Sequence, residues 1–145
     1  DVFISEYLSF HLTTEEFFGE VKSVMAADGV LAYNVIASAE GEYSELFRSM
    51  YRTAEGVWQD IWVFPIGIGS SGTADTRRNI IVLATDTRLP ESEVRARIAS
   101  RIDGRVSIAG FAQMAEDLYT EPVPVADVPL LTDAHAPVDS LIKVQ

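Results

Sequence analysis

The chain has 145 residues, no cysteine, and 22 acidic against 11 basic residues, which gives a formal net charge of −11 at pH 7. This charge excludes the basic surface that binds nucleic acid or anionic membranes, and the lack of cysteine excludes disulfides and thiolate metal sites. With 48% hydrophobic residues, the composition is that of one globular domain, which we place at residues 1–145.

The first predicted helix covers residues 13–27. Thr13 or Thr14 is suited to the N-cap, and Glu16 is placed to complete a capping box. Apolar residues then recur at helical spacing along one face. Gly29 is predicted to end the helix in the left-handed conformation.

Three strands are predicted after this helix. Residues 30–36 form an apolar run rich in β-branched residues, which predicts a strand buried on both faces, with Asn34 as its polar break. Residues 43–56 predict a second amphipathic helix, and residues 58–66 and 79–85 predict the other two strands. The loop between these last two strands has no helical pattern, so they are expected to pair antiparallel.

The remaining segments are less regular. The glycine-rich residues 67–72 favour a flexible hairpin loop, with a lid over a site as the other interpretation. Residues 90–102 predict a helix with acidic residues near its start and arginines near its end, and residues 108–119 predict a further short helix. A proline-rich, extended tail follows from residue 120. The order helix, strand, helix, strand, strand indicates an α/β fold with helices on both faces of the sheet.

Three segments of the sequence carry a common pattern. Residues 1–17 have an opening Asp, a short loop and then HLTTEEF. Residues 27–36 read ADGVLAYNVI, and residues 131–139 read LTDAHAPVD. Together these segments resemble the spermidine synthase family, especially its spermidine synthase-like members, in which the first segment follows a strand. The resemblance implies the C-terminal half of a Rossmann-like methyltransferase fold, with about three strands and the last two antiparallel. It also implies that the nucleoside-binding N-terminal half is absent from these residues.

The resemblance assigns five candidate site residues. Asp1 corresponds to the acid that takes a proton from the attacking amine, although a terminal residue without a partner is the alternative. Glu6, Tyr7 and His11 are candidates for substrate binding, and each has a structural or solvent-exposed alternative. Asn34 is expected to face the cofactor or to satisfy a neighbouring backbone group. No metal is expected, because the only two histidines lie far apart in the sequence.

The leading functional hypothesis is transfer of an aminopropyl group from decarboxylated S-adenosylmethionine to a polyamine amine, by a domain that is incomplete in this chain. One alternative is an S-adenosylmethionine-dependent methyltransferase of unknown acceptor. The other is a truncated, non-catalytic domain that acts through protein association. The expected small-molecule partner is a polyamine-type substrate, and neither nucleic acid nor a membrane is expected to bind.

The predicted strand at residues 30–36 also has a consequence for assembly. A half-sheet would leave the edge of this strand exposed, and such an edge pairs readily with another chain. We therefore expect a homo-oligomer, or a partner that completes the sheet. A cytoplasmic location is expected, because the sequence has no signal peptide, no apolar run of about 20 residues and a cytosolic type of cofactor.

Overall fold

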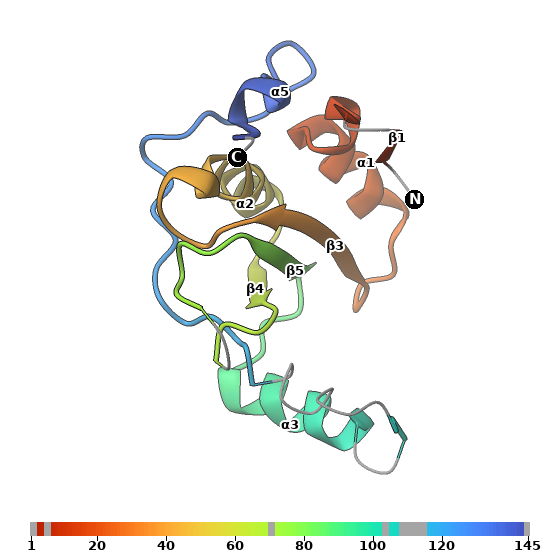
Figure 1. The fold of residues 1–145 in the computed structure, drawn as a ribbon. Helices are drawn as coiled ribbons and strands as arrows, with labels where there is room; N and C mark the ends of the chain where they lie inside the picture. Colours follow the sequence, from red (N-terminus) through yellow and green to blue (C-terminus); the bar gives the residue numbers. More distant parts are fainter. Residues whose placement is uncertain (1–2, 5–6, 70–71, 103–104, 108–115, 144–145) are drawn as a thin grey trace.

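The structure is a computed structural model that describes residues 3–4, 7–69, 72–102, 105–107 and 116–143 (Figure 1). Short 3-10 helices precede both α1 and α2. The elements follow in the order β1 (Phe3–Ile4), β2 (Tyr7–Leu8), η1 (Phe10–Leu12), α1 (Glu15–Val24), β3 (Val30–Ala37), η2 (Glu42–Ser44), α2 (Glu45–Val57), β4 (Asp60–Pro65), β5 (Arg78–Thr85), α3 (Glu91–Ile102) and α5 (Val138–Leu141).

The main sheet has three strands in the order β3-β5-β4, and β5 pairs antiparallel with both neighbours. Tyr33, Val82 and Val63 lie in one row across the three strands. Because β3 and β4 both run opposite to β5, their carboxyl ends meet at the same edge of the sheet. The predicted α/β class, the three strands and the antiparallel last pair are confirmed.

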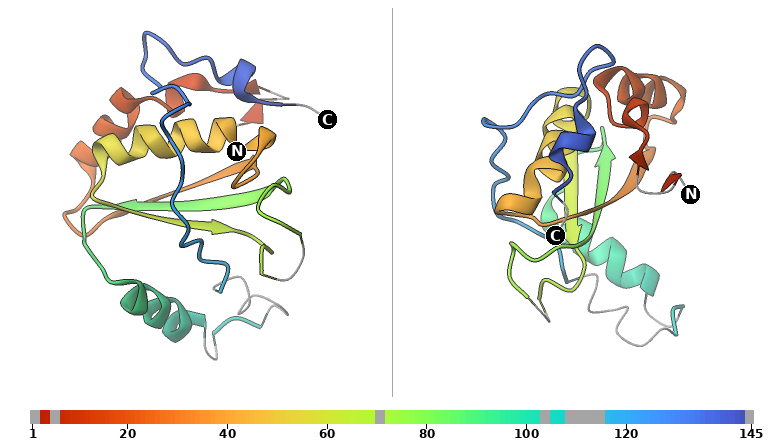
Figure 2. Two further views of the ribbon diagram at one scale, coloured as in Figure 1. Left: turned by 90° about the vertical axis from the view of Figure 1, so that its left-hand side faces the viewer. Right: turned by 45° about the horizontal axis from the view of Figure 1, so that its top comes forward.

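Helices cover both faces of this sheet, as predicted. In Figure 2, α1 and α2 lie on one side and α3 lies on the other. On the first side, Phe47 of α2 is fully buried against the β-strand residues Ile80 and Val82. On the second side, Val94 of α3 packs with Phe64 of β4. The alternation of side chains along each strand therefore supplies two separate cores.

β3 is not buried on both faces, so that prediction is wrong. Its residues alternate between the two faces, and Val30 and Ile36 are 55% and 48% exposed on the outer one. The reason is the position of α3, which packs on the β4 side of the outer face with Phe64 and Leu118. The apolar run correctly indicated a strand, but it could not show which part of a face a helix would cover.

The ends of α1 also differ from the prediction. Thr14 is the N-cap, with its hydroxyl accepting from the Phe17 amide at 3.3 Å, but Glu16 does not complete a capping box and instead accepts from the Asp133 amide at 3.0 Å. Gly29 is not among the glycines with positive φ. A Cβ at Gly29 would lie 2.9 Å from the Ala26 carbonyl oxygen, so this glycine is needed for close backbone approach.

The C-terminal segment has no regular helix or strand before the short helix α5, which the sequence did not predict, and it crosses the molecule (Figure 2). Leu131 is fully buried in the core beneath α2, and its amide donates a hydrogen bond to the Thr53 hydroxyl at 3.0 Å. Asp133 accepts from the Thr14 hydroxyl at 2.8 Å, which joins the tail to the start of α1. Most of the helix predicted at residues 108–119 lies outside the described residues, and Leu118 and Tyr119 are not helical.

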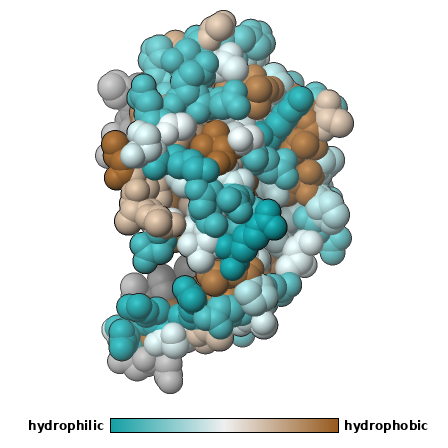
Figure 3. Space-filling view, turned by 180° about the vertical axis from the view of Figure 1, so that it is seen from behind, coloured by the Kyte–Doolittle hydropathy of each residue, from teal (hydrophilic) through white to brown (hydrophobic). Residues whose placement is uncertain are grey.

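The surface seen from behind is mostly hydrophilic, with separate hydrophobic areas between the polar ones (Figure 3). Among the described residues, no helix combines the length and the apolar character needed to cross a membrane.

Candidate functional site

The carboxyl edge of the sheet is the natural place for a site in this fold. β3 and β4 both end there, and α2 begins there after the loop that follows β3. In open α/β sheets, ligands bind in the crevice beyond the carboxyl ends of the strands.

A cavity of about 530 Å³ lies beside this edge, between the loop after β3, the first turns of α2 and the C-terminal tail. It is lined by Glu40, Gly41, Ser44, Arg48, Pro122, Pro124 and Asp127. The volume is within the range of small-molecule pockets. Both acidic residues of the lining are exposed to solvent, whereas its one basic residue, Arg48, is buried.

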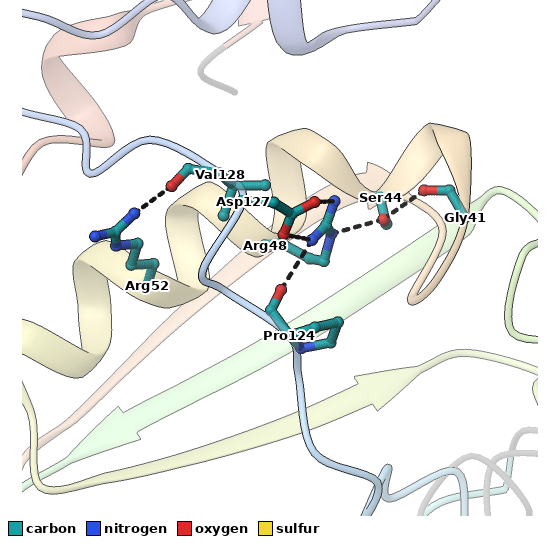
Figure 4. A network of polar contacts seen from close by, with 7 residues as sticks. All are labelled: Gly41, Ser44, Arg48, Arg52, Pro124, Asp127 and Val128. Carbon is teal, nitrogen blue, oxygen red and sulfur yellow. Dashed lines mark hydrogen bonds and ion pairs between the residues drawn. The ribbon is translucent and has the colours of Figure 1, made fainter.

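Arg48 holds the tail against α2 (Figure 4). Its Nε donates to the Ser44 hydroxyl at 2.9 Å, and one Nη donates to the Pro124 carbonyl oxygen at 2.9 Å. The two Nη groups also donate to the two oxygens of Asp127, at 2.5 and 3.0 Å. These hydrogen bonds hold the pKa of Asp127 below its usual range. The arrangement is a bidentate arginine–carboxylate pair, which fixes geometry as well as charge.

Tyr119 links the cavity residue Glu40 to strand β4. Its hydroxyl donates to the Glu40 carboxylate at 2.7 Å, and its amide donates to the Val63 carbonyl oxygen at 2.8 Å. Burial raises the pKa of Tyr119, and the hydrogen bond to Glu40 raises it further. The phenol is therefore a neutral donor near pH 7 that positions the Glu40 carboxylate at the cavity.

The loop that begins at Gly67 does not fit a phosphate or nucleoside cradle. Asp117 is buried, and its two carboxylate oxygens accept from the amides of Gly67 and Gly69 at 2.6 and 3.1 Å. In a cradle, such amides point at the negatively charged or polar groups of the ligand. Here a carboxylate of the protein already takes these donors, so the loop is fastened to the body at this point.

None of the predicted site residues is among the described residues that line the cavity. Asp1 and Glu6 lie outside the described residues, so their predicted roles stay predictions. Tyr7 lies in β2 opposite Ile4. His11 lies in η1, is exposed, and its ring centroid is 3.7 Å from that of Phe10.

Asn34 lies inside β3, three residues before the strand ends at Ala37. Its side chain is exposed, and its Nδ2 donates to the side-chain Oδ1 of Asn79 at 3.0 Å. Neither Asn34 nor His11 is among the residues that line the cavity. Within the described part of the chain, no group of three His, Asp or Glu residues is arranged to hold a metal ion.

Sequence reasoning missed the residues that build the cavity, although one signal was available. Arg48 directly follows the buried Phe47 in the first turn of α2, and a buried arginine requires a partner. That partner, Asp127, lies 79 residues further along the chain, and nothing local in the sequence pairs the two.

Two comparisons, with protein-family models and with curated proteins, gave no match. Among solved structures, the chain is similar to the crystal structure of a probable spermidine synthase from Corynebacterium glutamicum ATCC 13032, with a TM-score of 0.52 and 20% sequence identity. The match covers 90% of this chain and 48% of the solved one, so this chain spans about half the length of the protein it matches. The similarity shows the fold alone: a mixed α/β domain that corresponds to part of a Rossmann-like fold.

Proposed function

We propose that this chain provides the acceptor-binding side of a spermidine synthase-like aminopropyltransferase domain. The observation that carries the proposal is the structural match, which extends over 90% of the chain to a probable spermidine synthase. The sequence segments that resemble the family lie at the start of the chain, at β3 and in the tail, and the tail is in contact with the start of α1.

The charge distribution favours a cationic acceptor. The chain carries a net charge of −11, and the cavity at the carboxyl edge presents the exposed carboxylates of Glu40 and Asp127. Its only basic side chain, Arg48, is already paired with Asp127. Carboxylates at such an edge would attract an alkylammonium group, which is the charge that a polyamine carries near pH 7.

The reaction requires one acceptor amine to be neutral when it attacks. The amine nitrogen forms a bond to the carbon beside the donor sulfonium, the carbon–sulfur bond breaks, and the proton of the amine passes to a base. We assign this proton to Asp1, with Glu6, Tyr7 and His11 as candidates for holding the acceptor. A general base in this position contributes typically 10²–10⁴-fold to the rate.

The donor itself, decarboxylated S-adenosylmethionine or S-adenosylmethionine, is not assigned to a site in this chain. The amides of Gly67 and Gly69 are bonded to Asp117, and no other described loop pairs a glycine-rich turn with a preceding strand and a following helix. The proposal therefore concerns the acceptor and its proton, and the role predicted for Asn34 toward the donor stays a prediction.

The test is an assay of the complete gene product with a diamine and either decarboxylated S-adenosylmethionine or S-adenosylmethionine, with products identified by mass spectrometry. Aminopropylated diamine is expected, and Asp1→Asn is expected to lower kcat about 10²–10⁴-fold. The matched control is Asp28→Asn, the same chemical change in an exposed residue before β3, at the opposite edge of the sheet.

Two results would contradict the proposal. Methyl transfer from S-adenosylmethionine without aminopropyl transfer would favour a methyltransferase. A protein that binds neither donor nor diamine would favour a non-catalytic domain that acts through association.

A further inference from the structure

The cavity at the carboxyl edge carries one negative charge in excess, and that charge lies on Glu40. The lining contains two carboxylates, Glu40 and Asp127, and one guanidinium, Arg48. Both oxygens of Asp127 accept from Arg48, so these two charges offset each other (Figure 4). Glu40 forms no ion pair with any described residue. Its carboxylate is therefore the charged group of the cavity that is free to meet a ligand.

The main chain that carries the Glu40 side chain is held from two directions. The Glu40 amide donates to the Ala74 carbonyl oxygen at 3.0 Å, and the Glu40 carbonyl oxygen accepts from the hydroxyl of the fully buried Ser38 at 2.6 Å. The next residue, Gly41, has a φ of 74°, which favours glycine. A recognition group on a fixed main chain loses less conformational entropy when a ligand binds.

Tyr119 orients the Glu40 carboxylate. The Tyr119 hydroxyl donates to Oε1 of Glu40 at 2.7 Å, whereas Oε2 accepts no hydrogen bond from a described residue. Tyr119 is anchored in turn, because its amide donates to the Val63 carbonyl oxygen at 2.8 Å. Two residues earlier, the buried Asp117 accepts from the Gly67 amide at 2.6 Å. One oxygen of Glu40 is thus fixed by the protein, and the other can accept from a ligand.

The chemistry of the lining fits one end of an alkylamine. A primary ammonium group can donate to Oε2 of Glu40, and the rings of Pro122 and Pro124 offer apolar surface to the methylene groups that follow it. An anion would be repelled by Glu40. A second ammonium group would find no second unpaired carboxylate among the lining residues.

We propose that Glu40, positioned by Tyr119, holds the terminal ammonium of the acceptor that does not react. This inference rests on the proposed function for the identity of the acceptor, and it adds the residue that selects a diamine over a monoamine. In aminopropyl transfer, one amine of the acceptor loses its proton and attacks, while the other stays charged. A monoamine has no second ammonium group for Glu40 to bind while its only amine reacts.

Calorimetric titration of the complete gene product with 1,4-diaminobutane, without donor, tests the binding step. Glu40→Gln is expected to weaken binding about tenfold or more, because it removes a charge-assisted hydrogen bond. Glu42→Gln is the matched control and is expected to leave the affinity unchanged, since Glu42 is exposed and does not line the cavity. Tyr119→Phe keeps the ring and the main-chain bond to Val63 but removes the hydroxyl, and it is expected to weaken binding about threefold.

The preference between two acceptors tests the selection step. The ratio of kcat/KM for 1,4-diaminobutane to kcat/KM for n-butylamine is expected to fall about tenfold in Glu40→Gln, mainly through a higher KM for the diamine. A merely structural role of Glu40 would lower kcat/KM for both amines alike and leave this ratio unchanged.

Equal affinity of the Glu40→Gln and Glu42→Gln variants for 1,4-diaminobutane would overturn the proposal, and so would an unchanged acceptor preference in Glu40→Gln. A Tyr119→Phe variant with the affinity of the parent protein would overturn the positioning role. The proposed reaction fails separately: a protein that binds the diamine through Glu40 but transfers no aminopropyl group refutes the reaction and supports the site. Aminopropyl transfer with no dependence on Glu40 refutes the site and supports the reaction.

Discussion

The two outer strands of the sheet differ in what lies beside the edge that does not pair with β5. β4 has six residues, ends in Pro65, and is bridged by Tyr119, whose amide donates to the Val63 carbonyl oxygen at 2.8 Å. β3 has eight residues and no comparable cover among the described residues. The chain thus closes one side of its sheet with its own C-terminal tail and leaves the other side open to a further strand.

The tail can close the β4 side because α2 holds it along its length. Arg48 bonds to Pro124 and Asp127, and Arg52 bonds to the Val128 carbonyl oxygen (Figure 4). On the β4 side, long-range hydrogen bonds from α2 hold the tail in place, whereas on the free side of β3 no described segment is held in this way.

The largest expected effect is truncation of a buried tail residue. Leu131→Ala removes a fully buried side chain from the main core and is expected to lower the free energy of unfolding by about 2–5 kcal/mol. The matched change on the open side is Val30→Ala, which is expected to cost less than about 1 kcal/mol because Val30 is 55% exposed. Urea unfolding of both variants measures the difference. Similar losses would mean that β3 is covered in the protein tested or that the tail is not part of the core.

The second effect concerns the grip of α2 on the tail. Arg48→Met keeps the length of the side chain but removes its hydrogen bonds to Ser44, Pro124 and Asp127, so a loss of about 2–3 kcal/mol is expected. Arg52→Met removes one bond, to Val128, and is expected to cost about 1 kcal/mol or less. Limited proteolysis should cut the tail of the Arg48 variant faster than the tail of the Arg52 variant. Equal cutting would show that the Arg48 contacts do not hold the tail.

The fold was predictable where the signals are local. The strand expected at residues 79–85 is observed at Arg78–Thr85, because a β-branched run bounded by polar loops has one stable arrangement. The absence of a helix between the last two strands was enough to predict their antiparallel pairing, which is confirmed. The sequence could not predict which part of each sheet face a helix covers. The position of α3 over Phe64 depends on contacts between residues far apart in the sequence.

The candidate site was much less predictable than the fold. The resemblance pointed to the opening segment, where Asp1 and Glu6 lie outside the described residues, and to Asn34, which lies within β3. The cavity instead depends on contacts between α2 and the tail, such as Arg48 with Asp127, which are 79 residues apart. No periodic pattern encodes such a pair. The sequence signal for the pair was a charged residue, Arg48, among the buried residues of a helix. Such a charge requires a partner, but the sequence does not show which residue that partner is.

The smallest expected effect is a change in how stability depends on pH. The pKa of Asp127 is lowered in the folded protein by the hydrogen bonds from Arg48. A lowered folded pKa means that this carboxylate stabilises the fold above its usual pKa of 3.8, and that the contribution is lost as the pH falls through the folded value.

Asp127→Asn is therefore expected to lower the Tm at pH 6, and the difference from the parent protein should shrink as the pH falls below 3.8 and then through the lower pKa of the folded state, where the folded carboxylate becomes protonated. Because the Asp127 side chain is 67% exposed, the difference at pH 6 should be small and should fall further in about 1 M salt. Thermal unfolding of both proteins between about pH 2 and pH 6 measures it. A Tm difference that stays constant across this range would mean that Asp127 acts through shape and neutral hydrogen bonds, and that charge contributes nothing to closing the β4 side.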